Sequence, residues 1–297
     1  MMAPFDTPTR FVAGDPDAGR PELPAGRELT LPDRGTTFVR TVDGPPGAPT
    51  VLLLHGWTVT AALNWFRVYR PLSQHHHVVS FDQRGHGRGI RPDGRFTLRD
   101  AVDDAVAVLD ALGVERAVVA GYSMGGTVAQ LLARHHPDRV AGLVLAATWA
   151  HGPSSALQNR ALRGSHLAGG ALRRMSGPRQ TAAIRAVWGR VAPTSPSQRP
   201  PWFVDEVLSG SMPHIVGAGR ELTRFDSRPW ISSIDTPAGV FVTTRDNVVP
   251  PGRQHALAAR LPEAEIRYAP IDHDGCVVRP DAFVTPFVDL VRAVSPD

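Results

Sequence analysis

The chain of 297 residues contains no lysine, so all 32 of its basic residues are arginines. Together with 28 acidic residues they give a formal net charge of only +4. No arginine-rich run and no aromatic–basic module of the known nucleic-acid-binding types accompanies this small excess. We therefore expect the arginines to form a solvated surface, and we expect no nucleic-acid partner.

The chain also lacks the features of secreted and membrane-spanning proteins. Its one cysteine, Cys276, excludes an intrachain disulfide, which fits a reducing compartment. No apolar run approaches the ~18 residues that a transmembrane helix requires. The first residues have neither the basic start nor the apolar stretch of a secretory signal. We expect a cytoplasmic protein with no transmembrane segment.

What the chain does contain is an alternation of short apolar runs and amphipathic segments. Residues 1–27 are rich in proline, glycine and aspartate, and we expect them to form an irregular lead-in. Continuous apolar runs are typical of strands covered on both faces, whereas apolar residues at a spacing of three and four are typical of helices. The strands predicted in this way are 29–31, 37–42, 51–54, 78–81, 117–120, 140–147, 239–243 and 265–268. The predicted helices are 61–72, 98–112, 124–136, 254–261 and 282–294.

This alternation predicts an α/β protein with a mostly parallel sheet of eight strands and helices on both of its faces. Between about residues 150 and 230 the alternation stops, and helical segments and proline clusters take its place. We therefore predict one α/β core, formed by residues 28–150 and 231–297. A helical insertion at 151–230 follows its sixth strand.

The most informative motif is the segment G-Y-S-M-G at 121–125, which follows a predicted strand and begins a predicted helix. This is the nucleophile elbow G-x-S-x-G in the structural setting that the motif requires. The flanking glycines permit a turn too tight for side chains, so that the hydroxyl of Ser123 is exposed. The beginning of the helix supplies free N–H groups and the positive end of a dipole, which favour a developing oxyanion.

A serine hydroxyl is a poor nucleophile until a base removes its proton. In this kind of site the chain order is serine, then acid, then histidine. Asp246 follows the predicted strand 239–243, and His273 follows the predicted strand 265–268. The carboxyl ends of parallel strands meet at one edge of a sheet, so both side chains are expected at the edge that carries Ser123.

Other histidines and acids compete for these roles. The run 75–77 precedes a strand and is expected at the surface, and the pair 135–136 ends a helix, where a cation is favourable. Two more histidines, His151 and His214, lie in the insertion and do not match the expected order. The rival acids are Asp235, Asp272 and Asp274, of which the last two are too close to His273 in the chain to reach its far ring nitrogen easily.

With these motifs the chain resembles the α/β-hydrolase superfamily, in particular its serine esterase and lipase branch. The resemblance covers residues 28–150 and 231–295. It rests on H-G-W at 55–57, F-D-Q-R-G-H-G at 81–87, the elbow and the two late loops. It implies that the backbone N–H groups of Trp57 and Met124 form the oxyanion hole. It also implies that the second motif is structural and that the insertion 151–230 is a helical cap over the active site.

The implied activity is cleavage of carboxylic esters through an acyl-enzyme on Ser123, with no metal and no organic cofactor. The expected partner is a small ester with an apolar acyl group. A carbon–carbon bond hydrolase, a cofactor-free haloperoxidase and a non-catalytic binding protein remain alternatives with the same three residues. Epoxide hydrolases and haloalkane dehalogenases of this fold use aspartate at the elbow, which disfavours both.

The insertion concentrates positive charge, with 11 arginines against four acidic residues between 151 and 232. Charge gathered above an active site suggests an anionic substrate or peripheral contact with an anionic surface. Arginines that point outward into water remain the alternative explanation. Aromatic residues and methionines of the insertion suggest an apolar acyl pocket, or equally the core of the cap. They are Met175, Trp188, Trp202, Phe203, Met212 and Trp230.

Overall fold

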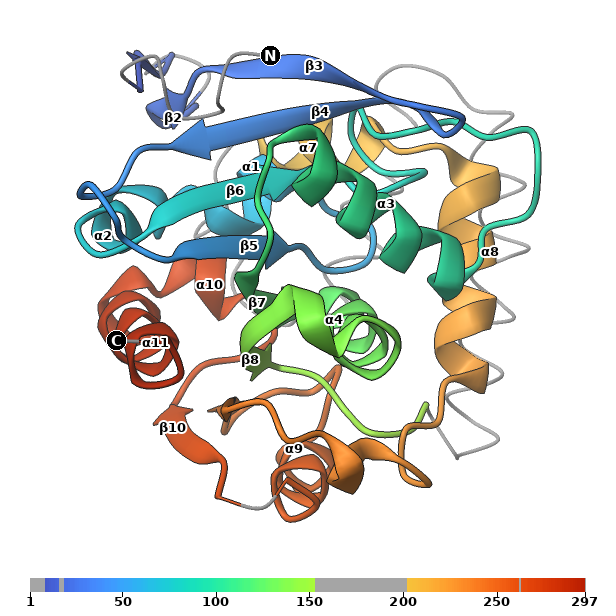
Figure 1. The fold of residues 1–297 in the computed structure, drawn as a ribbon, viewed down its shortest axis with the longest axis vertical. Coiled ribbons are helices and arrows are strands. Elements are labelled where there is room, and N and C mark those ends of the chain that lie inside the picture. The colour runs from blue at the N-terminus through green and yellow to red at the C-terminus, as the bar shows by residue number, and fades with distance from the viewer. Residues whose placement is uncertain (1–8, 16–18, 153–201, 262, 297) are drawn as a thin grey trace.

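A computed structural model describes residues 9–15, 19–152, 202–261 and 263–296 of the chain. Its centre is a sheet of eight strands in the order β10-β9-β8-β7-β5-β6-β4-β3, with helices on both faces (Figure 1). The strands of this sheet are β3 (Gly26–Leu31), β4 (Gly35–Val42), β5 (Thr50–Leu54), β6 (His77–Phe81), β7 (Ala117–Tyr122), β8 (Val140–Ala146), β9 (Ala238–Thr243) and β10 (Glu265–Ala269).

Six of these strands, from β10 to β6, run parallel to their neighbours, and only the pairs β6–β4 and β4–β3 are antiparallel. The antiparallel hairpin lies at one edge, where no crossover helix is needed. The central strands β5, β7 and β9 are buried along nearly their whole length, because helices cover both faces. The prediction of a mostly parallel eight-stranded α/β sheet is therefore confirmed.

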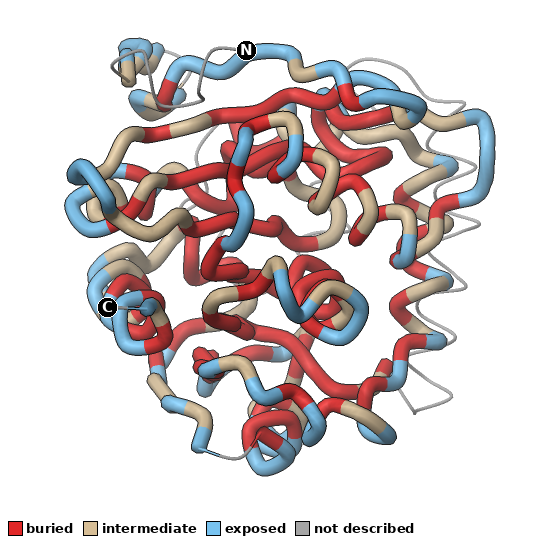
Figure 2. The backbone as a smooth tube through the Cα atoms, viewed as in Figure 1, coloured by how far each residue is buried: buried red, intermediate tan, exposed pale blue. Residues whose placement is uncertain are grey.

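Two hydrophobic cores lie on opposite faces of the sheet, and Figure 2 shows the buried backbone running through the middle of the molecule. One core is built on the helices α3 (Leu98–Ala111), α4 (Met124–His135) and α9 (Pro251–Ala258). The other core is built on α1 (Ala61–Trp65), α2 (Tyr69–Ser73), α10 (Gly275–Val278) and α11 (Pro280–Ala293). The described helices include none that is long and apolar enough to cross a membrane.

Three expectations need correction. The segment 61–72 is not one helix but two short ones, α1 and α2, because the chain turns after Trp65. The lead-in 1–27 is not wholly irregular, since β1 (Phe11–Val12) and β2 (Leu23–Pro24) pair in a small antiparallel sheet and β3 already begins at Gly26.

The run 75–77 is not entirely at the surface. His76 is buried, and its Nε2 lies 2.8 Å from Ser295 Oγ. Burial lowers the pKa of His76 to about 4, so that the imidazole is neutral.

Most of the predicted insertion, residues 153–201, lies outside the described part of the chain. The described remainder contains the helices α7 (Phe203–Leu208) and α8 (Met212–Arg224), followed by the short 3₁₀ helix Ile231–Ser233. A second 3₁₀ turn, Pro137–Arg139, precedes β8. The helix α8 runs along one side of the molecule in this view (Figure 1).

Candidate active site

Ser123 occupies the sharp turn between β7 and α4. Its backbone has φ 53° and ψ −115°, a combination that an L-residue adopts only under strain. Neighbouring groups hold this conformation: the N–H of Ser123 donates to Ala146 O at 2.9 Å, and Thr148 Oγ1 donates to Ser123 O at 2.9 Å. The strained turn places the hydroxyl at the carboxyl edge of the sheet, as the elbow motif predicts.

The glycines of the elbow are required by the closeness of neighbouring backbone. A Cβ at Gly121 would come within 2.2 Å of Gly125 O, and a Cβ at Gly125 within 2.0 Å of Leu54 O. Both distances are far shorter than real Cβ contacts, and the opposing atoms are backbone atoms that cannot move aside. The spacing G-x-S-x-G is therefore required because α4 packs so closely against the ends of β5 and β7 that no side chain fits at these two positions.

The structure brings Ser123, His273 and Asp246 together in a chain of hydrogen bonds. Ser123 Oγ lies 3.0 Å from His273 Nε2, and His273 Nδ1 lies 2.7 Å from Asp246 Oδ2. An ionised carboxylate only accepts hydrogen bonds, so Nδ1 carries the proton and Nε2 is free to accept from the serine hydroxyl. This is the geometry required of a nucleophile, its base and the acid that orients the base.

Asp246 is held by four hydrogen bonds of 2.8 Å or shorter and by a longer one from Gln254 Nε2 at 3.4 Å. Its Oδ1 accepts from the N–H groups of Val248 at 2.8 Å and Val249 at 2.7 Å. Its Oδ2 accepts from Thr243 Oγ1 at 2.7 Å, in addition to His273. The carboxylate is buried at the end of β9, where the backbone donors replace the water it has lost.

The basicity of His273 follows from two opposing effects. Burial alone lowers the pKa of the imidazole. The charge of Asp246 and its hydrogen bond to Nδ1 act in the other direction, with further help from Asp272 and Asp274, and the net result is a pKa above the ordinary value of 6.5. The ring is thus a stronger base than a free histidine, which suits the removal of a serine proton.

The turn after β5 lies opposite the elbow. A Cβ at Gly56 would be 3.5 Å from Ser123 Cβ, so the two turns face each other closely. The N–H of Gly56 donates to Asn64 Oδ1 at 2.8 Å, while its carbonyl lies 2.8 Å from His55 Nδ1. Within the described part of the chain, the N–H groups of Trp57 and Met124 have no hydrogen-bond partner. Both are therefore available to an oxyanion at Ser123.

His55 fixes the orientation of this turn. Its Nε2 accepts from the N–H of Gln83 at 2.9 Å, so the ring proton lies on Nδ1 and is donated to the carbonyl of Gly56. Burial lowers the pKa of His55 to about 4, which keeps the ring neutral. In a trans peptide the C=O and the N–H point in opposite directions, so a carbonyl held by His55 turns the N–H of Trp57 the other way.

The predicted structural role of the second motif, 81–87, agrees with its contacts. Asp82 accepts from the N–H of Ala61 at 3.0 Å and the N–H of Arg88 at 2.9 Å, which ties two loops together. His86 is buried, and its Nδ1 lies 3.0 Å from Arg84 O. Neither side chain contacts Ser123.

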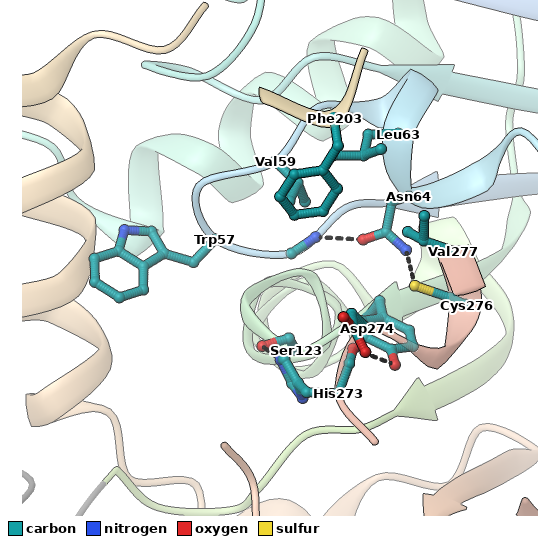
Figure 3. Close-up of a pocket in the computed structure, with 12 residues that line it drawn as sticks. Trp57, Val59, Leu63, Asn64, Ser123, Phe203, His273, Asp274, Cys276 and Val277 are labelled. Atoms are coloured by element: carbon teal, nitrogen blue, oxygen red, sulfur yellow. Dashed lines mark hydrogen bonds between the residues drawn. The ribbon is translucent and has the colours of Figure 1, made fainter. Parts of the chain in front are cut away.

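A pocket of about 460 Å³, counting its open mouth, lies beside Ser123 and His273. Figure 3 shows the side chains that line it, most of which are apolar. The wall opposite the serine consists of Val59, Leu63, Phe203 and Val277. Asn64 and Cys276 close the far end, where Asn64 Nδ2 lies 3.6 Å from Cys276 Sγ. Of the aromatic residues singled out in the insertion, Phe203 lines this pocket.

The other aromatic residues of the insertion have different places. Trp202 packs edge-on against Phe66 at 5.4 Å and is buried in one core, whereas Trp230 packs edge-on against Phe225 at 6.4 Å and lies half-buried against the other core. Met212 begins α8. Met175 and Trp188 lie outside the described residues.

The rival residues lie elsewhere or have other partners. His214 Nε2 lies 2.9 Å from Pro92 O, and the backbone of His151 pairs with that of Asp226 in an isolated antiparallel β-bridge. Asp272 is close to the site, but it accepts from the N–H of His273 itself at 2.7 Å and does not reach the ring.

Sequence reasoning missed Tyr122 as a supporting residue of the site. The hydroxyl of Tyr122, the residue before Ser123, donates to the carbonyl of His273 at 2.9 Å. This hydrogen bond fixes the backbone of the loop that carries His273. The position of Tyr122 inside the elbow motif was the only signal. Motif reasoning treats that position as variable.

The chain matches the family model described as the alpha/beta hydrolase fold over residues 49–280, and it belongs to this family. A protein of Caulobacter vibrioides named as a carbamate hydrolase, RutD, is 39% identical over 107 residues, which make up 36% of this chain and 40% of that protein. The 2-hydroxymuconate semialdehyde hydrolase of a Pseudomonas species is 35% identical over 164 residues, 50% of this chain and 54% of that protein. These matches span only about half or less of the relatives' length.

Among solved structures, the enol-lactonase of Burkholderia xenovorans is similar to this chain with a TM-score of 0.76 and 25% sequence identity. The similarity covers 90% of this chain and 100% of that structure. The resemblance to the α/β-hydrolase superfamily is therefore confirmed, both in the family model and in three dimensions.

Proposed function

We propose that the chain is a serine hydrolase that cleaves carboxylic esters through an acyl-enzyme on Ser123. The observation that carries this proposal is the hydrogen-bonded relay from Ser123 Oγ through His273 to Asp246, at 3.0 Å and 2.7 Å. The relay lies at the mouth of an apolar pocket and faces two free backbone N–H groups. Nucleophile, base, orienting acid and oxyanion donors are the complete set that acyl transfer requires.

The reaction proceeds in two halves. Ser123 Oγ attacks the ester carbonyl carbon while His273 Nε2 takes the hydroxyl proton, and the resulting oxyanion is stabilised by the N–H groups of Trp57 and Met124. The carbon–oxygen bond to the alcohol then breaks, and His273 gives its proton to the departing alcohol. Water attacks the acyl-enzyme by the same route, which releases the acid and restores the serine. The chemistry needs no metal and no organic cofactor.

The pocket favours an uncharged, apolar acyl group. Its wall of Val59, Leu63, Phe203 and Val277 offers no partner for a charge, and its one ionisable acid, Asp274, would repel a carboxylate. We propose that the insertion 151–230 is a cap over this pocket, because Phe203 of α7 lines the pocket and α8 binds the indole of Trp57, another lining residue. Of the 11 arginines counted in this region, eight lie between 160 and 199, outside the described residues.

The first experiment is hydrolysis of a chain-length series of p-nitrophenyl esters by the wild type and by Ser123→Ala. We expect turnover that disappears in the variant, with an optimum at acyl chains that fit the pocket. A fluorophosphonate should label the wild type at Ser123 and leave the variant unlabelled. If the wild type neither turns over any ester nor accepts the label, the proposal is wrong. Raising the salt concentration tests the arginine-rich cap, since it should weaken turnover of an anionic ester and spare a neutral one.

The likeness to 2-hydroxymuconate semialdehyde hydrolase favours a second candidate, hydrolysis of a carbon–carbon bond next to a carbonyl group. The same three residues would serve both reactions, so the substrate distinguishes them. A dienone substrate turned over faster than any p-nitrophenyl ester would favour this candidate. Turnover of esters alone would favour the first.

A further inference from the structure

The backbone and the side chain of Trp57 contact different parts of the molecule. Its backbone N–H belongs to the turn that faces Ser123, whereas its indole points away from the serine and toward α8, as Figure 3 shows. The indole Nε1 donates a hydrogen bond to the carbonyl of Ile215 in α8 at 2.8 Å. Trp57 is half-buried, and it lies between the pocket and the helix.

The indole rests in a notch of α8 that exists because residue 219 is glycine. A Cβ at Gly219 would come within 2.9 Å of Trp57 Cζ2, where ordinary contact begins at 3.4 Å. Helix interiors disfavour glycine, because it loses more conformational freedom than alanine. Gly219 is thus a costly residue in α8, and the close approach of the indole is a physical reason for it.

The helix α8 is held in place by contacts that do not involve Trp57. The N–H of Ser211, which precedes the helix, donates to Gly85 O at 2.7 Å, and His214 Nε2 lies 2.9 Å from Pro92 O. The helix is therefore a fixed platform, fastened to the loop between β6 and α3, against which the indole rests.

The backbone of the turn needs such a support on its outer side. The N–H and the carbonyl of Gly56 are hydrogen-bonded to the buried side chains of Asn64 and His55. In the part of the chain that the structure describes, these two side chains make no such hydrogen bond with the residues directly after Gly56. Thr58 adopts φ 68°, in the left-handed region, so the chain immediately after Trp57 is strained. Among the described residues, the hydrogen bond from Nε1 to Ile215 is the only one that Trp57 donates.

We propose that Trp57 is a positioning residue, whose indole is seated in the Gly219 notch of α8 and thereby fixes the direction of its own backbone N–H toward the oxyanion. The inference rests on the proposed acyl-transfer function. It adds that α8 of the insertion, by binding the indole of Trp57, helps to position an oxyanion donor. A displaced indole tilts the peptide between Gly56 and Trp57. The carbonyl oxygen of the substrate then loses alignment with its donor in the transition state, while substrate binding in the apolar pocket continues.

The test compares two alanine substitutions in the same helix. Gly219→Ala pushes a methyl group against the indole of Trp57, whereas Gly217→Ala pushes an equivalent methyl group against Phe96, with the same change in helix propensity. Because a misplacement of ~1 Å can cost ~10²-fold in rate, we expect Gly219→Ala to lower kcat about tenfold. Its KM should stay within about twofold of the wild type, and Gly217→Ala should stay close to the wild type in both constants.

The inhibition constant of a trifluoromethyl ketone is a second measurement, which would not change if Trp57 had only a structural role. The adduct of the ketone with Ser123 places an oxyanion in the hole, so the inhibition constant should rise in Gly219→Ala by the same factor as kcat falls. Trp57→Phe removes the Nε1 donor and keeps an aromatic ring, and should show the same pattern if Gly219→Ala does not fold. The melting temperature of each variant shows whether it is folded at the assay temperature.

The possible results distinguish a failure of the positioning role of Trp57 from a failure of the proposed hydrolase activity. If the wild type is active and the two alanine variants lose activity equally, or neither loses any, the inference is overturned and the function stands. The same holds if Gly219→Ala raises KM and leaves kcat unchanged. If the wild type neither hydrolyses esters nor reacts with a fluorophosphonate, the proposed function falls, and this inference falls with it.

Discussion

Replacing Asp246 by asparagine would test the relay more sharply than removing the serine. The substitution keeps the shape of the side chain and changes one oxygen acceptor into an amide donor. The two backbone N–H groups of Val248 and Val249 require an acceptor at Oδ1, so the amide oxygen must face them. The amide NH2 then faces His273 Nδ1, which has to become the acceptor.

This forced orientation reverses the tautomer of His273. With the proton on Nε2 instead of Nδ1, the nitrogen that lies 3.0 Å from Ser123 Oγ can no longer accept the serine proton. In the serine–histidine–aspartate relay as a class, the same tautomer reversal costs about 10⁴-fold in kcat. We expect a loss of that size here, equivalent to about 5 kcal/mol of transition-state stabilisation.

The pH profile gives a second measurement on the same variant. The base must be neutral to act, so activity falls as the pH drops through the pKa of His273. In the wild type this pKa is raised above its ordinary value, chiefly because Asp246 outweighs the effect of burial. In Asp246→Asn the charge is gone and burial remains, so the pKa should fall and the acid limb of kcat/KM should move to lower pH.

The control is Asp272→Asn, which removes a neighbouring negative charge. Its Oδ1 can still accept from the N–H of His273, so the loop is preserved. We expect only a small shift of the acid limb and no large loss of kcat, because Asp272 does not contact the ring. An acid limb in Asp246→Asn that coincides with that of the wild type would refute the assigned relay, as would a loss of kcat below about tenfold.

Three further predictions concern the rest of the fold. Gly125→Ala should fail to fold stably, since its Cβ would meet Leu54 O at 2.0 Å, and a melting temperature near that of the wild type would contradict this. Asp104→Ala should lower the free energy of unfolding by about 3 kcal/mol in a guanidinium titration, because it removes the carboxylate that the buried guanidinium of Arg84 contacts at 2.6 Å and leaves only the longer ion pair with Asp100 at 3.3 Å. Burial raises the pKa of Cys276 to about 12, so iodoacetamide should alkylate this thiol only after unfolding, and modification of the native protein at the unfolded rate would count against its burial.

The sheet and the relay were accessible from the sequence because their signals are local. Strands such as β5 and β7 are buried on both faces, so they appear as uninterrupted apolar runs. The elbow requires glycine at two fixed positions for steric reasons, so its motif is nearly a description of the geometry. The order of strands then places Asp246 and His273 at the same edge as Ser123.

Other features depend on contacts that no local pattern encodes. The break between α1 and α2 is hidden because both helices are buried in one core, so the apolar spacing continues through the turn. The burial of His76 depends on Ser295, more than two hundred positions away, and histidines next to a strand otherwise suggest an exposed run. Thr243, which orients Asp246, is an ordinary strand residue by sequence.

The described contacts of α8 suggest how substrate choice and chemistry are connected in this chain. The helix rests on the loop after β6 through His214 and Ser211, and it receives the indole of Trp57 from the loop after β5. Both loops leave the carboxyl edge of the sheet, where the relay is also built. With the oxyanion role proposed for Trp57, a sequence change in α8 also affects the position of that donor unless it preserves the notch at Gly219. We therefore expect α8 to tolerate few substitutions on the face that Trp57 contacts, and more on its exposed face.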